Sequence, residues 1–148
     1  MPMTTAVVLI GRLSVALAAT AAGVVALAPA ATVWDGVYTD EQATRGQVLY
    51  EKECASCHLD NLRGEGLAPG LIADAFTYRW QDGPLSDLFI VMKATMPESR
   101  PASLTDQEYV DIVAYLLKKN QYPSGQRELG KNPDELKQIT FAKPATAK

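Results

Sequence analysis

Five consecutive residues, Cys54-Ala55-Ser56-Cys57-His58, constrain this chain more than any other feature. They form the pattern C-x-x-C-H, which is typical of covalent attachment of a c-type haem. In such a site two thiols add to the two vinyl groups of a porphyrin, and the adjacent histidine places its imidazole on the iron. A helical segment suits this spacing, because steps of three and four residues bring the thiols and the imidazole to one face. The chain has two cysteines and one histidine, so all its thiol and imidazole ligands lie in this segment.

Two other kinds of site also use closely spaced cysteines. A redox disulfide between Cys54 and Cys57 would resemble C-x-x-C sites that follow a strand and open a helix. Here the pair instead comes at the end of a helical pattern. A closed zinc site uses four Cys or His ligands, whereas this chain offers three adjacent ones. We therefore predict one covalent haem c, with a haem-free thiol–disulfide oxidoreductase as the alternative.

The N-terminal segment is typical of an exported protein. Arg12 supplies a positive charge, residues 13–27 are rich in Ala, Val and Leu, and Ala28-Pro29-Ala30 fits the A-x-A cleavage pattern. We predict a signal peptide over residues 1–30 and a periplasmic or otherwise exported protein, with no membrane span after cleavage. An uncleaved membrane anchor is the alternative, because residues 13–33 carry no charge and are long enough to span a bilayer.

The rest of the chain has the length of one domain. A hydrophobic content of 47% and a charged content of 21% are typical of a globular protein rather than a disordered one. The net charge of −3 gives no support to nucleic-acid binding. We predict a domain over residues 31–123. We also predict an extension over residues 124–148 that is partly disordered, because the chain becomes polar after Pro123.

Two capping boxes indicate two helices. Thr39-Asp40-Glu41-Gln42 opens a helical pattern that runs to about residue 53. Thr105-Asp106-Gln107-Glu108 opens an amphipathic pattern that ends near residues 118–120. Gly46 lies in the middle of the first helix, where glycine costs about 1 kcal/mol relative to alanine. It is therefore either a tolerated residue or a point where another helix backbone comes close.

Residues 59–104, between these helices, are rich in glycine and proline. We expect one short helix there, with Ser86 as its N-cap, and another around residues 134–139. So much loop is unusual in a small domain, but a buried haem would supply the apolar core that the loops lack. The sequence therefore predicts an all-α fold, with three to four helices and long loops around one covalent haem.

With His58 on one side of the iron, the other axial position needs a second ligand. Methionine is a common haem ligand, and Met92 and Met96 are the only methionines after residue 30. Met92 has the helical spacing of a core contact. Met96 precedes Pro97, which stiffens an exposed turn. We predict Met96 as the sixth ligand, with Met92 or an open sixth position as alternatives.

Residues from about 39 to 117 resemble a class I monohaem cytochrome c of the bacterial, periplasmic type. The matching pieces are Gly46, Tyr50, the C-x-x-C-H segment, Pro69, Met96-Pro97 and Tyr115. In that family the first and last helices cross with a glycine on one and an aromatic residue on the other. A proline carbonyl also accepts a hydrogen bond from the proximal imidazole, and Pro69 is the matching residue. Leu59 departs from the family, in which many members carry glycine; we expect it to affect packing at the haem edge.

The resemblance implies an electron carrier, not an enzyme, whose iron cycles between Fe(II) and Fe(III). It implies that Cys54 and Cys57 anchor the ring and that His58 and Met96 are the axial ligands. Three residues are candidates to lie over the haem or to bond its propionates: Tyr78, Arg79 and Trp80. The alternatives are ordinary loop packing for Trp80 and a solvated charge for Arg79.

The implied partners are redox proteins, namely a dehydrogenase as donor and an oxidase or another cytochrome as acceptor, with the chain itself a monomer. The alternatives are a haem subunit of a periplasmic dehydrogenase or oxidase complex, and a peroxidase-like or gas-binding protein with a labile sixth ligand.

Overall fold

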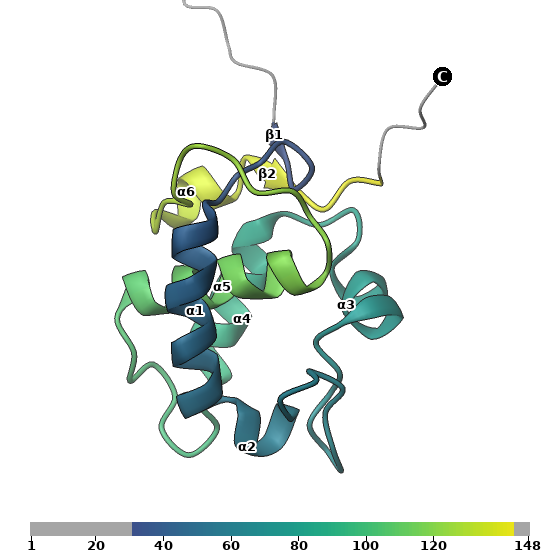
Figure 1. Ribbon diagram of the computed structural model, residues 1–148, viewed down its shortest axis with the longest axis vertical. Coiled ribbons are helices and arrows are strands. Elements are labelled where there is room, and N and C mark those ends of the chain that lie inside the picture. The colour runs from purple at the N-terminus through teal and green to yellow at the C-terminus, as the bar shows by residue number, and fades with distance from the viewer. Residues whose placement is uncertain (1–30, 144–148) are drawn as a thin grey trace, which may run out of the picture.

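The computed structural model describes residues 31–143 (Figure 1). The elements over this range are β1 (Ala31–Thr32), α1 (Asp40–Glu53), α2 (Ala55–His58), α3 (Ala73–Trp80), α4 (Leu85–Thr95), α5 (Asp106–Lys119), α6 (Pro133–Leu136) and β2 (Ile139–Thr140). The two short strands pair in parallel, and helices form the rest of the regular structure. The predicted small all-α fold is confirmed. The predicted signal peptide lies outside the described residues.

The two long helices begin where the sequence indicates, but their caps differ. At α5 the capping box is complete, because Thr105 Oγ1 accepts from the Glu108 amide and the Glu108 carboxylate accepts from the Thr105 amide. At α1 only half of the predicted box forms: Thr39 accepts from the Gln42 amide. The Gln42 side chain is fully buried and instead bonds both backbone groups of Leu129, at 2.7 and 3.0 Å.

Helices α1 and α5 cross one another, as Figure 1 shows, and Gly46 makes the crossing possible. A Cβ atom at this position would lie 1.8 Å from the backbone oxygen of Asp111 in α5. Nearby, the rings of Tyr50 and Tyr115 pack with their centroids 5.2 Å apart. The expected close approach at Gly46 is confirmed, and the tolerated-residue alternative is wrong.

The segment between the long helices contains more helix than predicted. Helix α4 begins at Leu85 with Pro84 in the cap position, so the prediction of Ser86 as N-cap is wrong. Proline's fixed φ suits the extended backbone before a helix, and Ser86 is buried in the first turn. Helix α3 was not predicted. Its first residue, Ala73, donates its amide to the Asn120 side chain at 2.9 Å, which replaces a local cap.

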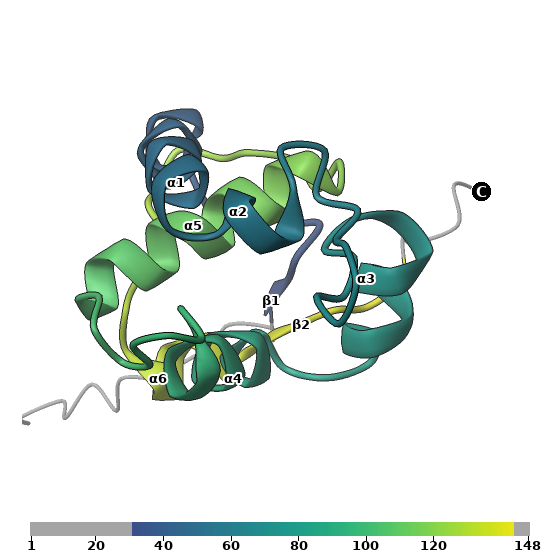
Figure 2. The same cartoon turned by 90° about the horizontal axis from the view of Figure 1, so that it is seen from below.

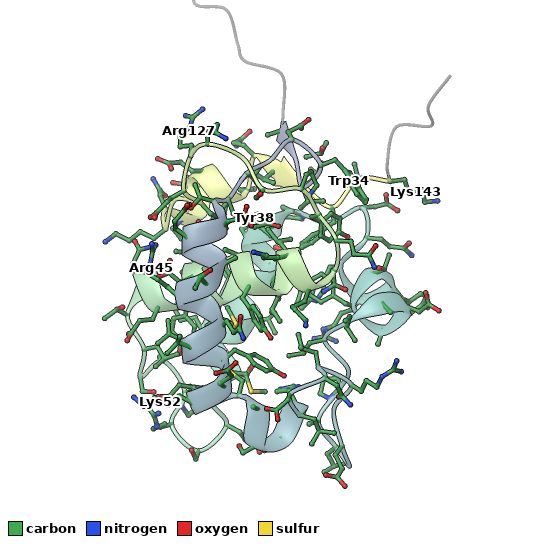
Figure 3. The ribbon with its side chains drawn as sticks, viewed as in Figure 1. Trp34, Tyr38, Arg45, Lys52, Arg127 and Lys143 are labelled. Atoms are coloured by element: carbon green, nitrogen blue, oxygen red, sulfur yellow. The ribbon has the colours of Figure 1, made fainter. Side chains whose placement is uncertain are left out.

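The C-terminal extension packs onto the domain over its described part, residues 124–143. Leu129, Leu136 and Phe141 are buried in the same core as the long helices. The Phe141 amide donates to the Gly83 carbonyl at 2.9 Å, and the Trp34 indole donates to the Ala142 carbonyl at 2.8 Å. Figure 3 shows Trp34 beside the end of this segment. The helix expected around residues 134–139 is the shorter α6, followed directly by β2.

Candidate functional site

A cavity of about 580 Å³ is lined by residues of α1, α2, α3, α4 and α5. Figure 2 shows how these helices are arranged. Its volume falls in the range of about 300–1,000 Å³ that is typical of small-molecule and cofactor sites. It is lined by every one of the predicted site residues, which are Cys54, Cys57, His58, Pro69, Trp80 and Met96. These residues come from four separate segments of the chain, so the fold brings together what the sequence keeps apart.

The C-x-x-C-H segment forms its own helical turn rather than the end of the first helix. Helix α1 ends at Glu53, and Cys54 interrupts the helical backbone with φ −126° and ψ −32°. The amides of Cys57 and His58 then donate to the Cys54 carbonyl at 3.2 and 3.0 Å. This single turn brings both thiols and the imidazole to the cavity wall.

The imidazole of His58 is held by the loop that follows it. Its Nδ1 lies 2.9 Å from the carbonyl oxygen of Pro69, as the resemblance implies for a proximal histidine. A hydrogen bond at Nδ1 favours the tautomer that keeps the Nε2 lone pair free for a metal. Gly64 lets the loop fold back, because a Cβ there would lie 2.2 Å from the Ala68 oxygen.

Leu59 ends the α2 turn with a backbone conformation that favours glycine. Its φ is 62° and its ψ is 158°, which an L-residue with a side chain adopts only at a cost. Leu59 is not among the residues that line the cavity. The departure from glycine is therefore a matter of backbone strain, and the expected effect on haem-edge packing has no support.

The thiol environment does not favour disulfide chemistry. No disulfide joins Cys54 and Cys57. Burial raises the pKa of Cys54 to about 11, and the negative charge of Glu53 adds to the shift. A thiol that attacks disulfides needs a lowered pKa, so that the thiolate is present at neutral pH. Cys54, the first cysteine of the pair, instead has a raised pKa.

Both candidate methionines line the cavity, but their surroundings differ. Met92 packs against the hydrophobic core from within α4. Met96 follows the last residue of α4, and its carbonyl accepts a hydrogen bond from the Tyr109 hydroxyl at 2.7 Å. Tyr109 is buried in α5. The backbone of Met96 is thus fixed at the cavity wall, at the point where α4 ends.

The three residues considered for contact with the haem do not all reach the cavity. Arg79 and Trp80 line it, with the guanidinium 5.0 Å from the centre of the indole ring. Tyr78 is 81% exposed and is not among the lining residues, so the idea that it lies over the haem is wrong.

Sequence reasoning missed three charged residues in the cavity wall, Glu53, Glu65 and Glu98. Glu65 and Glu98 are exposed, whereas Glu53 is not. Its side chain is only 6% exposed and forms ion pairs with Arg100 and, at 3.3 Å, with Lys52. Nothing in the sequence marks Glu53 as different from the exposed charges around it, since its main partner is 47 residues away.

These residues fit a covalently bound haem. Two thiols, an imidazole and a thioether meet in one cavity, whose remaining wall includes the apolar side chains of Leu88, Val91, Ile112 and Leu116. Among residues 31–143, no cluster of three or more His, Cys, Asp or Glu side chains is arranged to hold a bare metal ion. The zinc alternative therefore has no support in this range. No helix between residues 31 and 143 is long and apolar enough to cross a membrane.

Comparison with known proteins agrees with this fit. The family model described as cytochrome C oxidase, cbb3-type, subunit III matches residues 41–116, slightly more than half of the chain. No curated protein and no solved structure matches. The matched range contains the C-x-x-C-H segment and Met96, and a c-type cytochrome domain of this kind implies covalent haem c and haem-based electron transfer. The chain belongs to this family of c-type cytochromes.

Proposed function

We propose that this chain is an exported monohaem electron carrier of the class I type. In it, Cys54 and Cys57 bind one haem c through thioether bonds, and His58 and Met96 ligate its iron. The observation that carries the proposal is the single cavity lined by all four side chains. The A-x-A pattern at residues 28–30 supports export, where covalent haem attachment and electron transfer between soluble partners would take place.

The residues of this chain set the conditions for electron transfer. The haem, when bound, supplies an iron centre that gains and loses one electron. The Pro69 carbonyl orients the imidazole of His58 and favours the tautomer that leaves Nε2 free for the iron. The thioether of Met96 favours the reduced state and so raises the reduction potential. The apolar wall excludes water, and no bond in a substrate is made or broken.

A second candidate role is that of a haem subunit in an oxidase complex. The description of the matching family, an oxidase subunit, favours it. The chemistry at the haem would be the same, and only the partner would differ. The native mass of the haem-containing species in gently detergent-treated whole-cell extracts separates the two roles. A free carrier migrates at the mass of a single chain, and a subunit migrates with a larger assembly.

Covalent haem is tested by a pyridine haemochrome assay on the denatured protein. We expect haem to stay with the wild-type chain, because thioether bonds survive denaturation. The double variant Cys54→Ala/Cys57→Ala is expected to lose it. Ser56→Ala, which changes the exposed residue between the cysteines, should retain it. A wild-type chain that carries no haem would favour the haem-free thiol–disulfide oxidoreductase instead.

The sixth ligand is tested by Met96→Ala. We expect loss of the far-red sulfur-to-iron absorption band. The reduction potential should fall by more than about 0.1 V, a small part of the ~0.8 V range that axial ligands cover. Met92→Leu is the matched control and should keep the band, because Met92 packs in the core. If Met92→Leu loses the band and Met96→Ala keeps it, the assignment is reversed. A wild type without the band would favour the peroxidase-like or gas-binding alternative.

A further inference from the structure

An ion pair joins the two segments that carry the predicted haem attachment and the predicted sixth ligand. Glu53 lies directly before Cys54, and Arg100 lies four residues after Met96; their side chains form a salt bridge. We propose that Glu53 and Arg100 are positioning residues that latch the segment of residues 96–102 to the end of α1. The latch holds Met96 in place and limits the access of a second small ligand to the iron. The proposal rests on the proposed function, since it takes Met96 as the sixth ligand.

The Glu53 end of the latch is largely buried. Its carboxylate lines the cavity with only 6% of the side chain exposed, so it needs a cationic partner. Lys52 lies 3.3 Å away but is 76% exposed and adjacent in sequence, so it contributes little. Arg100 is therefore the partner that compensates the buried charge. Figure 3 places Lys52 at this end of α1, and in Figure 1 the loop between α4 and α5 runs beside it.

The Arg100 end is coupled to Met96 by a short, hydrogen-bonded segment. The Arg100 amide donates to the Pro97 carbonyl at 2.9 Å, so residues 97–100 form one closed turn directly after Met96. The Arg100 guanidinium also donates to Ser103 Oγ at 2.9 Å. A displacement of Arg100 thus moves Pro97, and with it the residue next to the ligand.

Hydrogen bonds to the backbone of Met96 itself provide a second attachment. The Tyr109 hydroxyl bonds the Met96 carbonyl from α5, and the Met96 amide donates to the Met92 carbonyl at 2.8 Å. The segment is tied to α4 again through the amide of Ala102, which donates to the Lys93 carbonyl at 3.0 Å. It is therefore attached to α5 and α4 at Met96, to α4 at Ala102 and to α1 at Arg100. Without the ion pair the α1 attachment is lost, while the α5 attachment keeps Met96 nearby. We expect the thioether to leave the iron more often without unfolding of the domain.

Imidazole binding to the ferric protein measures this opening. The apparent affinity of an external ligand equals its intrinsic affinity multiplied by the fraction of molecules in which the site is open. A larger open fraction therefore gives tighter apparent binding. Arg100 is half exposed, which limits the strength of the ion pair, so breaking the pair with Glu53→Gln or Arg100→Gln should raise the imidazole affinity by about fivefold. The double variant should show about the same fivefold increase, because each single change already breaks the pair. Arg100→Lys should restore part of the wild-type affinity. Binding is followed by loss of the far-red band.

The matched control is Asp40→Asn. This change breaks the ion pair between Asp40 and Lys118, in which the two charged atoms are 2.7 Å apart. Asp40 also belongs to α1 but lies at the opposite end of that helix from Glu53. Its imidazole affinity should equal that of the wild type. The proposal would be contradicted if the wild type and both single variants bound imidazole with equal affinity. It would also be contradicted if the double variant showed the product of the two single effects. A wild type that lacks the far-red band and binds imidazole as readily as Met96→Ala would instead overturn the assignment of Met96.

Discussion

Gly46→Ala is expected to destabilise the folded protein by about 2–3 kcal/mol, the upper part of the range for overpacking. The new Cβ would lie 1.8 Å from the Asp111 backbone oxygen, so α1 and α5 must move apart. A side-chain rotation cannot relieve a clash with backbone. Alanine favours the helix by only about 1 kcal/mol, which offsets part of the loss. The midpoint of urea unfolding, followed by circular dichroism of the haem-loaded protein, measures the change.

Val48→Ala is the matched control for this prediction. It lies two residues further along α1 with 63% of its surface exposed. Its effect on the free energy of unfolding should stay within about 0.5 kcal/mol. If Gly46→Ala proved as stable as Val48→Ala, the helices would not be in contact at this glycine. The crossing also positions the cavity, because Tyr50 of α1 and Ile112 of α5 both line it.

The parts of the fold that the sequence predicted are those with local causes. Helices α1 and α5 begin directly after Thr39 and Thr105, because the hydroxyls of these N-cap residues bond amides of the same segments. Helix α3 has no such local signal, since its first amide is bonded by Asn120, 47 residues away. The Gln42 side chain does not complete its capping box, again because of a residue distant in sequence. It bonds two backbone groups of Leu129, which only the folded chain brings near.

The residues of the site divide in the same way, into those with a local sequence signal and those without one. The C-x-x-C-H pattern is recognisable because its chemistry requires three residue types at fixed spacing. The role of Pro69 was predicted from a family resemblance, and the 2.9 Å contact between its carbonyl oxygen and His58 Nδ1 gives that role a physical basis. Glu53 and Tyr109 had no comparable signal. One is an acidic residue whose burial depends on Arg100, and the other is an aromatic residue of an apolar stripe whose hydroxyl reaches Met96.

A chain that ends at residue 123 is expected to lose most of its stability. It would lack Leu129, Leu136 and Phe141, each a buried side chain worth about 1.5–3 kcal/mol. It would also leave the buried Gln42 amide without its Leu129 partners, at about 1–3 kcal/mol. Small domains are stable by only about 5–15 kcal/mol. We expect the shortened protein to show a broad unfolding transition, or none, in the same urea experiment.

A single substitution in the full-length chain tests the same contact without risk of complete unfolding. Leu136→Ala should destabilise the protein by about 2–5 kcal/mol, because Leu136 is buried and its helix, α6, packs on α4. Lys137→Ala, at the adjacent exposed position, should change the stability by less than about 0.5 kcal/mol. Equal unfolding midpoints for the two variants, together with an unchanged midpoint for the shortened chain, would show that the extension is only attached to the domain. The family match ends at residue 116, so the expected losses would place part of the folding core of this cytochrome beyond the matched segment.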